Sequence, residues 1–234
     1  MRQLRRMVQI VQETNVNTYC EIGMNGGHSI VAMLEANPQI TAHAFDMMHW
    51  NYSKPIADLI SLRFGSRFQL HRGNSHKTVP AISKDLGQSC DLIFIDGDHT
   101  PQGARIDMLN CRGIAAPGAR VILDDIAIHS ETRPGPVVAL RQMEVAGLLQ
   151  TIERYGTFPP GHRYNPCMRA PDTGRSARSV CVPWGFAVCA YVAAQLNNKN
   201  WTSLSIVQTA RLTPELLLAG DHGHRIPGTI VQRL

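Results

Sequence analysis

The stretch YCEIGMNGGHSI, residues 19–30, places an acidic residue at the end of an apolar run, then three glycines within five positions, then a new apolar run. The acidic residue is Glu21, and the turn after it begins at Gly23. A glycine turn between a strand and a helix lets the main chain approach a ligand closely and directs the helix N-terminus at it. The stretch therefore predicts a nucleotide-type ligand at the end of a first strand.

The spacing of these glycines excludes the dinucleotide-binding fingerprint. That fingerprint requires G-x-G-x-x-G, whereas Gly23 is followed by the tetrapeptide MNGG. The pattern present is E-x-G-x-x-x-G, formed by Glu21, Gly23 and Gly27. An acidic residue beside the turn suits a ligand that has a cationic amino group and no pyrophosphate. Taken alone, the motif also allows a simpler interpretation, in which the glycines only let the chain bend.

Short apolar segments alternate along the chain with segments long enough for a helix. Five of them are TYCEIG, ITAHAFDM, RFQLHRG, DLIFIDG and ARVILDD, and LLQTIERYG and WGFAVCAYVAA are two further candidate strands. Continuous apolar runs are typical of strands in a parallel sheet that helices cover on both faces. We therefore expect an α/β fold with a mostly parallel seven-stranded sheet, preceded by a helix over residues 2–14, where apolar residues recur at helical spacing.

The C-terminal third of the chain departs from this pattern. Residues 156–183 are rich in Pro, Gly and Arg and show no period, which predicts a long loop. Residues 196–234 resemble neither strands nor crossover helices of the core. We expect one domain over residues 1–195 and a C-terminal extension of unknown role over residues 196–234.

Bulk composition limits the class of protein. Hydrophobic residues make up 44% and charged residues 18% of the chain, and no apolar run reaches the roughly 18 to 20 residues that cross a bilayer. The first residues lack the apolar block of a secretory signal, so a cytoplasmic protein is expected. The six cysteines are scattered without C-x-x-C pairs, which predicts free thiols. The net charge of +5 comes from dispersed arginines and does not by itself indicate nucleic acid.

A carboxylate ends the second apolar segment. Asp46 follows Glu21 by 25 positions. At about this distance, α/β nucleotide sites place an acid that accepts the ribose hydroxyls. The alternative for Asp46 is a helix N-cap.

Carboxylates also end the fourth and fifth segments, in LIFIDGDHT and VILDDI. Asp96 ends the fourth, and Asp124 and Asp125 end the fifth. Because neighbouring parallel strands lie less than about 5 Å apart, these acids can converge on one cation. Oxygen ligands favour Mg²⁺, and no Cys/His spacing indicates zinc. Each acid alone is a common turn residue. Asp98 can orient His99, bind metal through water, or cap the following helix.

Together these motifs resemble the class I S-adenosylmethionine-dependent methyltransferases. Over about residues 15–130, the set is similar to metal-dependent O-methyltransferases of the catechol type and of the bacterial sugar and macrolide type, and to the cephalosporin-hydroxylase-like family. The resemblance implies a Rossmann-like class I methyltransferase fold. The residues that it assigns to the cofactor S-adenosylmethionine are Glu21, Gly23, Met24, Asn25, Gly27, Ser29, Asp46, Met47, Asn74, Ser75 and Asp96.

The resemblance also implies roles. Met47 packs on the adenine, and the loop that ends with Ser75 lies along it, where a small polar residue such as Ser75 commonly bonds the base. Asp96, Asp124 and Asp125 hold Mg²⁺ or another divalent cation, and Asp96 and His99 are the catalytic residues, with His99 as the base. The expected reaction is methyl transfer to a hydroxyl of a small molecule such as a sugar, polyketide or polyphenol. A metal-independent methyltransferase and a catalytically inactive binding or scaffold protein are the alternatives.

The sequence after the fourth strand also bears on the methyl acceptor. Enzymes that methylate nucleic-acid bases often have N-P-P-Y or D-P-P-Y at this place, and IDGD stands here instead. Methylation of RNA or DNA is therefore disfavoured. The expected partner is a small hydroxylated substrate, and no membrane association is expected. Assembly into a homo-oligomer is possible.

Overall fold

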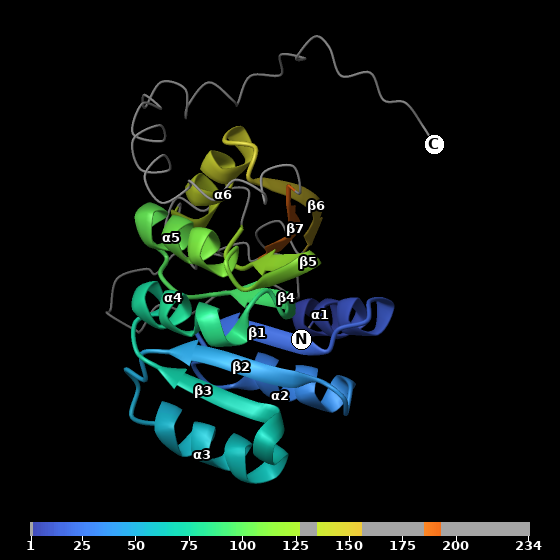
Figure 1. Cartoon of the computed structure of the whole chain (residues 1–234), viewed down its shortest axis with the longest axis vertical. Helices are drawn as coiled ribbons and strands as arrows, with labels where there is room; N and C mark the ends of the chain where they lie inside the picture. The colour runs from blue at the N-terminus through green and yellow to red at the C-terminus, as the bar shows by residue number, and fades with distance from the viewer. Residues whose placement is uncertain (1, 127–134, 156–184, 193–234) are drawn as a thin grey trace, which may run out of the picture. The chain divides into compact units, whose positions relative to one another are not determined.

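The computed structural model describes residues 2–126, 135–155 and 185–192. In this part, seven strands form one sheet in the order β3-β2-β1-β4-β5-β7-β6 (Figure 1). The first five strands pair in parallel, whereas β7 is antiparallel to both β5 and β6. The strands are β1 (Thr18–Ile22), β2 (Thr41–Asp46), β3 (Phe68–Arg72), β4 (Cys90–Ile95), β5 (Ala115–Leu123), β6 (Leu149–Tyr155) and β7 (Phe186–Tyr191). The predicted mostly parallel seven-stranded sheet is confirmed.

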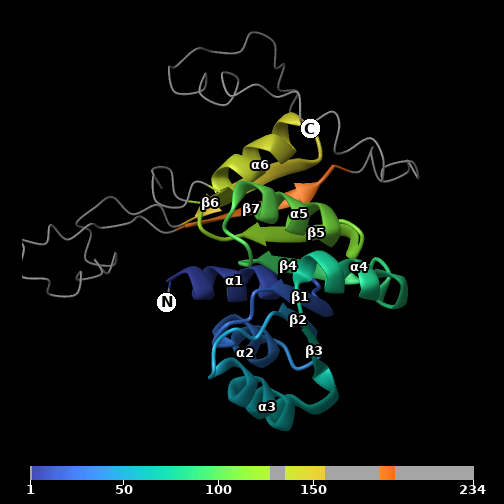
Figure 2. The ribbon, with the colours of Figure 1, turned by 90° about the vertical axis from the view of Figure 1, so that its left-hand side faces the viewer.

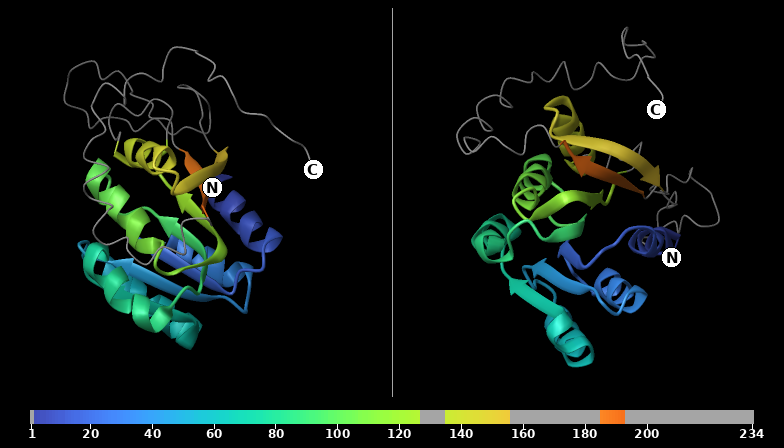
Figure 3. Two further views of the ribbon diagram at one scale, coloured as in Figure 1. Left: turned by 45° about the horizontal axis from the view of Figure 1, so that its top comes forward. Right: turned by 45° about the vertical axis from the view of Figure 1, so that its right-hand side comes forward.

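Helices cover both faces of the sheet, with α1 and α2 on one face and α4 and α5 on the other (Figure 3, right). The view in Figure 2 looks onto the face that α4 and α5 cover. On the first face, Met7, Ile30 and Ile60 of α1, α2 and α3 share one core with Tyr19 and Phe94 of the sheet. The helices are α1 (Arg2–Glu13), α2 (His28–Ala36), α3 (Ser53–Phe64), the short 3-10 helix η1 (Gly65–Arg67), α4 (Ser75–Leu86), α5 (Pro101–Cys111) and α6 (Gly135–Val145). The predicted leading helix is confirmed as α1.

The strand order reverses its direction at β1. The chain moves from β1 to β2 and β3 on one side, then returns to place β4 and β5 on the other side. Open α/β sheets bind ligands beside such a reversal, at the carboxyl ends of the strands. Glu21, Asp46 and Asp96 all lie at or just beyond these ends.

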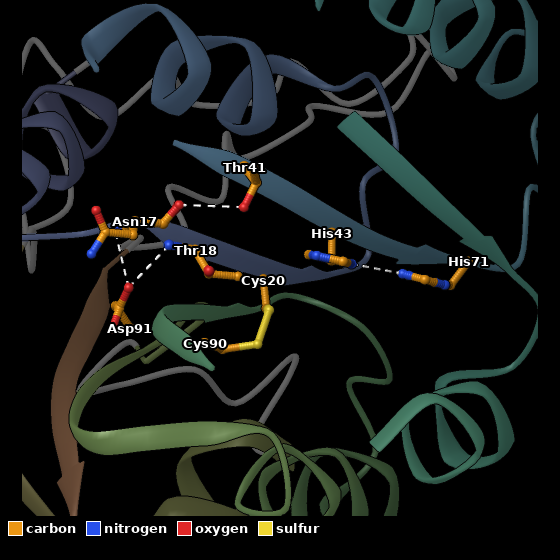
Figure 4. The surroundings of a disulfide bond; sticks show 8 residues. All are labelled: Asn17, Thr18, Cys20, Thr41, His43, His71, Cys90 and Asp91. Atoms are coloured by element: carbon orange, nitrogen blue, oxygen red, sulfur yellow. Dashed lines mark hydrogen bonds between the residues drawn. A yellow bond between two sulfur atoms is a disulfide. The ribbon is translucent and has the colours of Figure 1, made fainter. Parts of the chain in front are cut away.

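A disulfide corrects the prediction that all the cysteines are free thiols. Cys20 of β1 and Cys90 of β4 are fully buried and bonded to each other (Figure 4). β1 and β4 are neighbouring parallel strands, and the Cα atoms of the two cysteines lie 5.9 Å apart, within the range that a disulfide spans. Spacing along the sequence could not reveal this pair, because 70 residues separate its members. Cys111 and Cys189 are buried free thiols, as predicted.

Several predictions concern residues outside the described ranges. The expected loop of residues 156–183 and the extension of residues 196–234 lie there, and the boundary at residue 195 stays a prediction. Among the described helices, none has the length and apolar character needed to cross a bilayer. A cytoplasmic location also stays a prediction, and disulfides are rare in cytosolic proteins.

The disulfide closes a long loop, so its loss is expected to destabilise the fold. Reduction of the wild-type protein should lower its free energy of unfolding by about 2 to 4 kcal/mol. The double variant Cys20→Ala, Cys90→Ala should have a stability that reductant does not change. Thermal unfolding with and without dithiothreitol measures both effects. A non-reducing peptide digest in which Cys20 and Cys90 are never joined would contradict the assignment.

Candidate cofactor and acceptor site

A cavity of about 1000 Å³ opens at the carboxyl ends of the parallel strands. Its wall includes Gly23 after β1, Asp46 at the end of β2 and Gly73 after β3. Asp96 and Asp125, which follow β4 and β5, complete this side. The volume is at the upper end of the range found for small-molecule and cofactor sites. The cavity therefore lies where the order of the strands predicts a ligand.

The glycine turn allows three segments of main chain to meet at the cavity floor. Gly23 has φ +89°, and its N–H donates to the carbonyl of Phe45. A Cβ atom on Gly23 would lie only 2.0 Å from the carbonyl oxygen of Asp96. Gly27 also has a positive φ, and a Cβ there would lie 2.6 Å from Ile60 of α3. Gly23 is thus required for the close approach of main chain at the cavity, whereas a Cβ on Gly27 would meet the end of the Ile60 side chain.

Glu21 lies behind the turn and not on the cavity wall. It is 1% exposed, and its carboxyl group accepts hydrogen bonds from Tyr19 Oη at 2.8 Å and Ser29 Oγ at 2.5 Å. Burial raises the pKa of Glu21 to about 8, against a smaller lowering by the hydrogen bonds from Ser29 and Tyr19. Of the residues assigned to the cofactor, Glu21, Met24, Gly27 and Ser29 do not line the cavity. The contacts of these four with a cofactor stay predictions.

Asp46 faces the cavity, and the structure excludes the alternative that it caps a helix. The N-cap of α3 is Tyr52. The two oxygens of Asp46 accept the main-chain N–H groups of Asn25 at 2.9 Å and Met48 at 2.6 Å. A carboxylate has about four acceptor sites, so both oxygens can still bind hydroxyl groups. Met47, predicted to pack on the base, is 47% exposed and lies on the same wall.

Asn74 and Ser75 also lie on the wall, but each already has a partner in the protein. Asn74 is the N-cap of α4, and its Oδ1 accepts the N–H of His76. Ser75 Oγ donates to Asp107 Oδ1 at 2.6 Å. Ser75 can therefore contribute to ligand binding as an acceptor.

The predicted acidic cluster forms, with a different set of members. Asp96, His99 and Asp125 each offer a ligand atom, and these atoms lie within 4.8 Å of one another. His99 Nε2 is 3.2 Å from Asp96 Oδ1, and His99 Nδ1 is 3.3 Å from Asp125 Oδ2. Asp125 has φ +57°, which turns the chain immediately after Asp124. The converging group therefore contains Asp125 and not Asp124, and His99 is its third member.

Asp124 lies beside this group and has a different environment. Its Oδ1 accepts the N–H of Asp125 at 2.8 Å. Burial, followed by the negative charge of Asp96, raises the pKa of Asp124 to about 7. The predicted metal set of Asp96, Asp124 and Asp125 is therefore only partly assembled, because Asp124 is not one of the three converging residues.

Asp98 is not the N-cap of the following helix, and its other considered roles stay predictions. Its Oδ1 accepts the N–H of Thr100 at 2.8 Å, and Thr100 caps α5 by accepting the N–H of Gly103. Asp98 thus organises the turn before the helix.

Gly135, the first residue of α6, packs on the turn before α5, since a Cβ there would lie 1.9 Å from the carbonyl oxygen of His99.

Sequence reasoning missed several residues of the wall. They include His49, Trp50, His76, Thr100, Pro101 and Gly135. A signal existed for Trp50, an apolar residue shortly after Asp46 in the segment DMMHWNY. Its ring stacks on Tyr52, whose hydroxyl donates to Asn25 Oδ1 at 2.6 Å. No local signal existed for Gly135, because it approaches His99 only through the packing of α6.

Residues 20–126, which contain the turn, Asp46 and the acidic cluster, match a family model described as a methyltransferase domain. This segment is a methyltransferase domain. The match covers the five parallel strands that surround the cavity, from within β1 to just beyond β5. The predicted resemblance to methyltransferases is thereby confirmed for this part of the chain.

Solved structures share the fold of the methyltransferase domain. The O-methyltransferase TomG of Streptomyces achromogenes, involved in tomaymycin synthesis and solved with S-adenosylmethionine, is 15% identical, with a TM-score of 0.59 over 82% of this chain and 80% of TomG. The O-methyltransferase of Bacillus cereus, solved with S-adenosylhomocysteine, is 16% identical, with a TM-score of 0.58 over 82% and 81%. The calicheamicin methyltransferase CalS11 is 15% identical, with a TM-score of 0.52 over 68% and 74%. No curated protein matches the chain by sequence. The predicted Rossmann-like class I fold is confirmed.

A side chain at Gly23 is expected to disrupt the methyltransferase domain. Gly23→Ala would combine an unfavourable φ with a collision against main chain that cannot rotate away, so a loss of about 3 kcal/mol or more is expected. Gly65→Ala is the control, because Gly65 also has a positive φ but a Cβ atom there would meet no other atom within 4 Å. It should cost less than Gly23→Ala, because only the unfavourable backbone conformation, with φ 57° and ψ −130°, contributes. Equal losses in urea titrations of the two variants would contradict the close approach.

The pKa of Glu21 predicts how stability depends on pH. In the unfolded chain the ordinary value is 4.5, so between about pH 4.5 and 8 the folded protein holds a proton that the unfolded chain releases. The stabilisation from this proton is complete below pH 4.5 and is lost as pH rises through about 8. The stability of wild type relative to Glu21→Gln should therefore fall from pH 5 to pH 8 in urea titrations without cofactor. A constant or rising difference would show that Glu21 is ionised when folded.

Proposed function

We propose that this protein transfers a methyl group from S-adenosylmethionine to a hydroxyl oxygen of a small molecule. The observation that carries the proposal is a single cavity on a methyltransferase fold, with Asp46 on one part of its wall and the Asp96, His99 and Asp125 cluster on another. The ligands named for the TomG and Bacillus cereus structures support this choice of methyl donor.

The cofactor side of the cavity has the groups that an adenosyl sulfonium ligand needs. Asp46 would accept the ribose hydroxyls, and the main chain at Gly23 leaves room for the ligand to approach. Asp46, Asp96 and Asp125 give this wall an acidic character, which suits the positive charges of the sulfonium and amino groups. In the reaction the methyl group leaves sulfur with its bond electrons remaining there, the acceptor oxygen forms the new bond, and the hydroxyl proton goes to a base.

His99 is the proposed base, and its neighbours set a condition on this role. Both ring nitrogens lie close to carboxylate oxygens, whereas a neutral imidazole can donate from only one nitrogen. To act as a base the ring must be neutral, and it then donates to only one of the two carboxylates, Asp96 or Asp125. The other carboxylate is then best paired with a different, positively charged partner.

A divalent cation fits this requirement. Two carboxylates with an imidazole beside them are a suitable donor set for Mg²⁺ or Mn²⁺, and Asp96 and Asp125 would hold the ion. When bound, it would supply positive charge that favours the ionised form of an acceptor hydroxyl. Acceptors with two adjacent hydroxyls, as in sugars, polyketides or polyphenols, would suit such a site. We propose a small-molecule acceptor and no nucleic-acid partner.

The same contacts also support a second candidate, metal-independent methyl transfer. Asp125 contacts one ring nitrogen and Asp96 the other, so the ring is held without an ion. In that case Asp125 would orient the ring and Nε2 would take the proton beside Asp96. A catalytically inactive binding protein would keep the cavity but show no turnover with any hydroxylated acceptor.

The test is calorimetric titration with S-adenosylhomocysteine, followed by titration with Mg²⁺ and Mn²⁺. The loss of outer-shell partners alone reduces metal affinity about 10- to 100-fold, so Asp96→Asn and Asp125→Asn should lose at least this much. The affinity of Asp125→Asn for S-adenosylhomocysteine should stay within about threefold of wild type, because Asp125 is not among the residues assigned to the cofactor. Asp98→Asn is the matched control, since an amide oxygen can still accept the N–H of Thr100.

Activity then separates the candidates in a screen of diols and polyphenols. Methylation that EDTA and Asp96→Asn both abolish supports the metal-dependent reaction. Methylation that survives both would favour the metal-independent one. A folded protein that does not bind S-adenosylhomocysteine would contradict the proposed function as a whole.

A further inference from the structure

Asp107 is a buried acid for which the proposed reaction has no use. It lies on α5, and none of its surface is exposed. Charged side chains are almost never fully buried unless they are paired. Within the described ranges, Asp107 Oδ1 accepts a hydrogen bond from Ser75 Oγ at 2.6 Å, and Asp107 Oδ2 has no hydrogen-bond partner. Among the described residues, the Ser75 hydroxyl is thus the side-chain group that donates a hydrogen bond to the Asp107 carboxyl group.

The carboxyl group of Asp107 lies directly behind the cavity wall. A Cβ atom on Gly97 would lie 2.9 Å from Asp107 Oδ2 and 2.9 Å from Cγ2 of Ile22, and Gly97 itself lines the cavity. His76, also on the wall, has its Nε2 at 3.6 Å from Asp107 Oδ1, beyond hydrogen-bonding distance. Burial raises the pKa of Asp107, and the hydrogen bond from Ser75 lowers it.

The hydrogen bond to Asp107 decides what Ser75 can offer to a ligand. A serine hydroxyl has one proton and two acceptor lone pairs. Because the proton of Ser75 points at Asp107, only lone pairs remain for the cavity that Ser75 lines. Hydrogen bonds to carboxylates are short and strong, and 2.6 Å is within that range. The polarity of the Ser75 hydroxyl is therefore fixed from behind the wall.

The place of Ser75 in the cavity indicates which part of a ligand it meets. Ser75 follows β3, whereas Asp46 ends β2 and Asp96 follows β4. In the strand order β3-β2-β1-β4, Ser75 and Asp96 lie on opposite sides of Asp46. If Asp46 binds the ribose and the reacting methyl group lies toward Asp96, the base extends toward Ser75.

We propose that Asp107 sets the base specificity of the cofactor site by holding Ser75 as a hydrogen-bond acceptor for the amino group of adenine. This inference rests on the proposed function. In a base with an oxo group in place of the amino group, such as hypoxanthine, a lone pair of the oxo oxygen would face a lone pair of Ser75 Oγ, and the two would repel each other. Asp107 is a positioning residue, because it acts through Ser75 and does not touch the ligand.

The test compares two ligands that differ at position 6 of the base and, because the 6-oxo form carries a proton on N1, at N1 as well. The readout is therefore the change in preference that Asp107→Leu causes, and not the wild-type preference alone. Calorimetric titrations would use S-adenosylhomocysteine and its 6-oxo analogue, S-inosylhomocysteine. A buried polar group that loses its partner weakens binding by a factor of about ten or more, so wild type should prefer the adenosyl ligand at least about tenfold. Asp107→Leu frees the Ser75 proton to point either way, and the preference should fall to about threefold or less.

A matched control separates this role from a structural one. Asn110→Ala removes an amide on the same helix that approaches the His76 carbonyl at 3.5 Å, and it leaves Ser75 and Asp107 in place. It should keep the full preference. Asp107→Leu removes one partner of a buried hydrogen bond, so a somewhat lower unfolding temperature is expected, and the ligand preference of the folded variant decides the test. If Asp107→Leu does not fold, Asp107→Asn, whose amide can donate to Ser75, should lower the preference instead.

Three results would overturn the inference. Equal affinity of wild type for both ligands, with S-adenosylhomocysteine still bound, would do so and leave the proposed function intact. A folded Asp107→Leu that keeps a tenfold preference, with a lower unfolding temperature, would assign Asp107 a structural role only. A folded wild type that binds neither ligand would overturn this inference and the proposed function together.

Discussion

The close approach of main chain at Gly23 is the constraint on which the rest of the site depends. The ends of β1, β2 and β4 meet at this glycine. Its N–H donates to the carbonyl of Phe45, and its Cα packs against the carbonyl of Asp96. This contact sets the positions of Asp46 and Asp96, which lie one on each side of the turn. With any side chain at Gly23, the strand ends would separate and the two acids would lose their common cavity.

Buried acids behind this turn give the cavity its chemical character. Glu21, Asp107 and Asp124 all have pKa values raised mainly by burial, and none of them is balanced by a lysine or arginine hydrogen bond among the described residues. The hydrogen-bond donors to these three carboxyl groups are hydroxyls or main-chain N–H groups. Such an arrangement suits a cationic ligand, since added positive charge favours the ionised forms.

Much of the fold and part of the site could be predicted from local patterns. Apolar runs located all seven strands, because strands that are buried on both faces have little choice of side chain. The polar residues that end those runs located Asp46, Asp96 and Asp125 at one edge. The alternation of apolar and polar residues does not predict where a side chain points once the strand has ended. Asp125 has a left-handed conformation, and the converging group contains His99 and not Asp124.

The sequence by itself determined the layered α/β architecture, the position of the ligand edge and the class of the domain, because these depend on the order and periodicity of residues along the chain. Tertiary structure alone decided the Cys20–Cys90 bond, the withdrawal of Glu21 behind the turn and the pairing of Ser75 with Asp107. The physical reason is the same in each case. These contacts join residues of different elements, and only the packing of those elements sets which polar atoms meet and which are left buried.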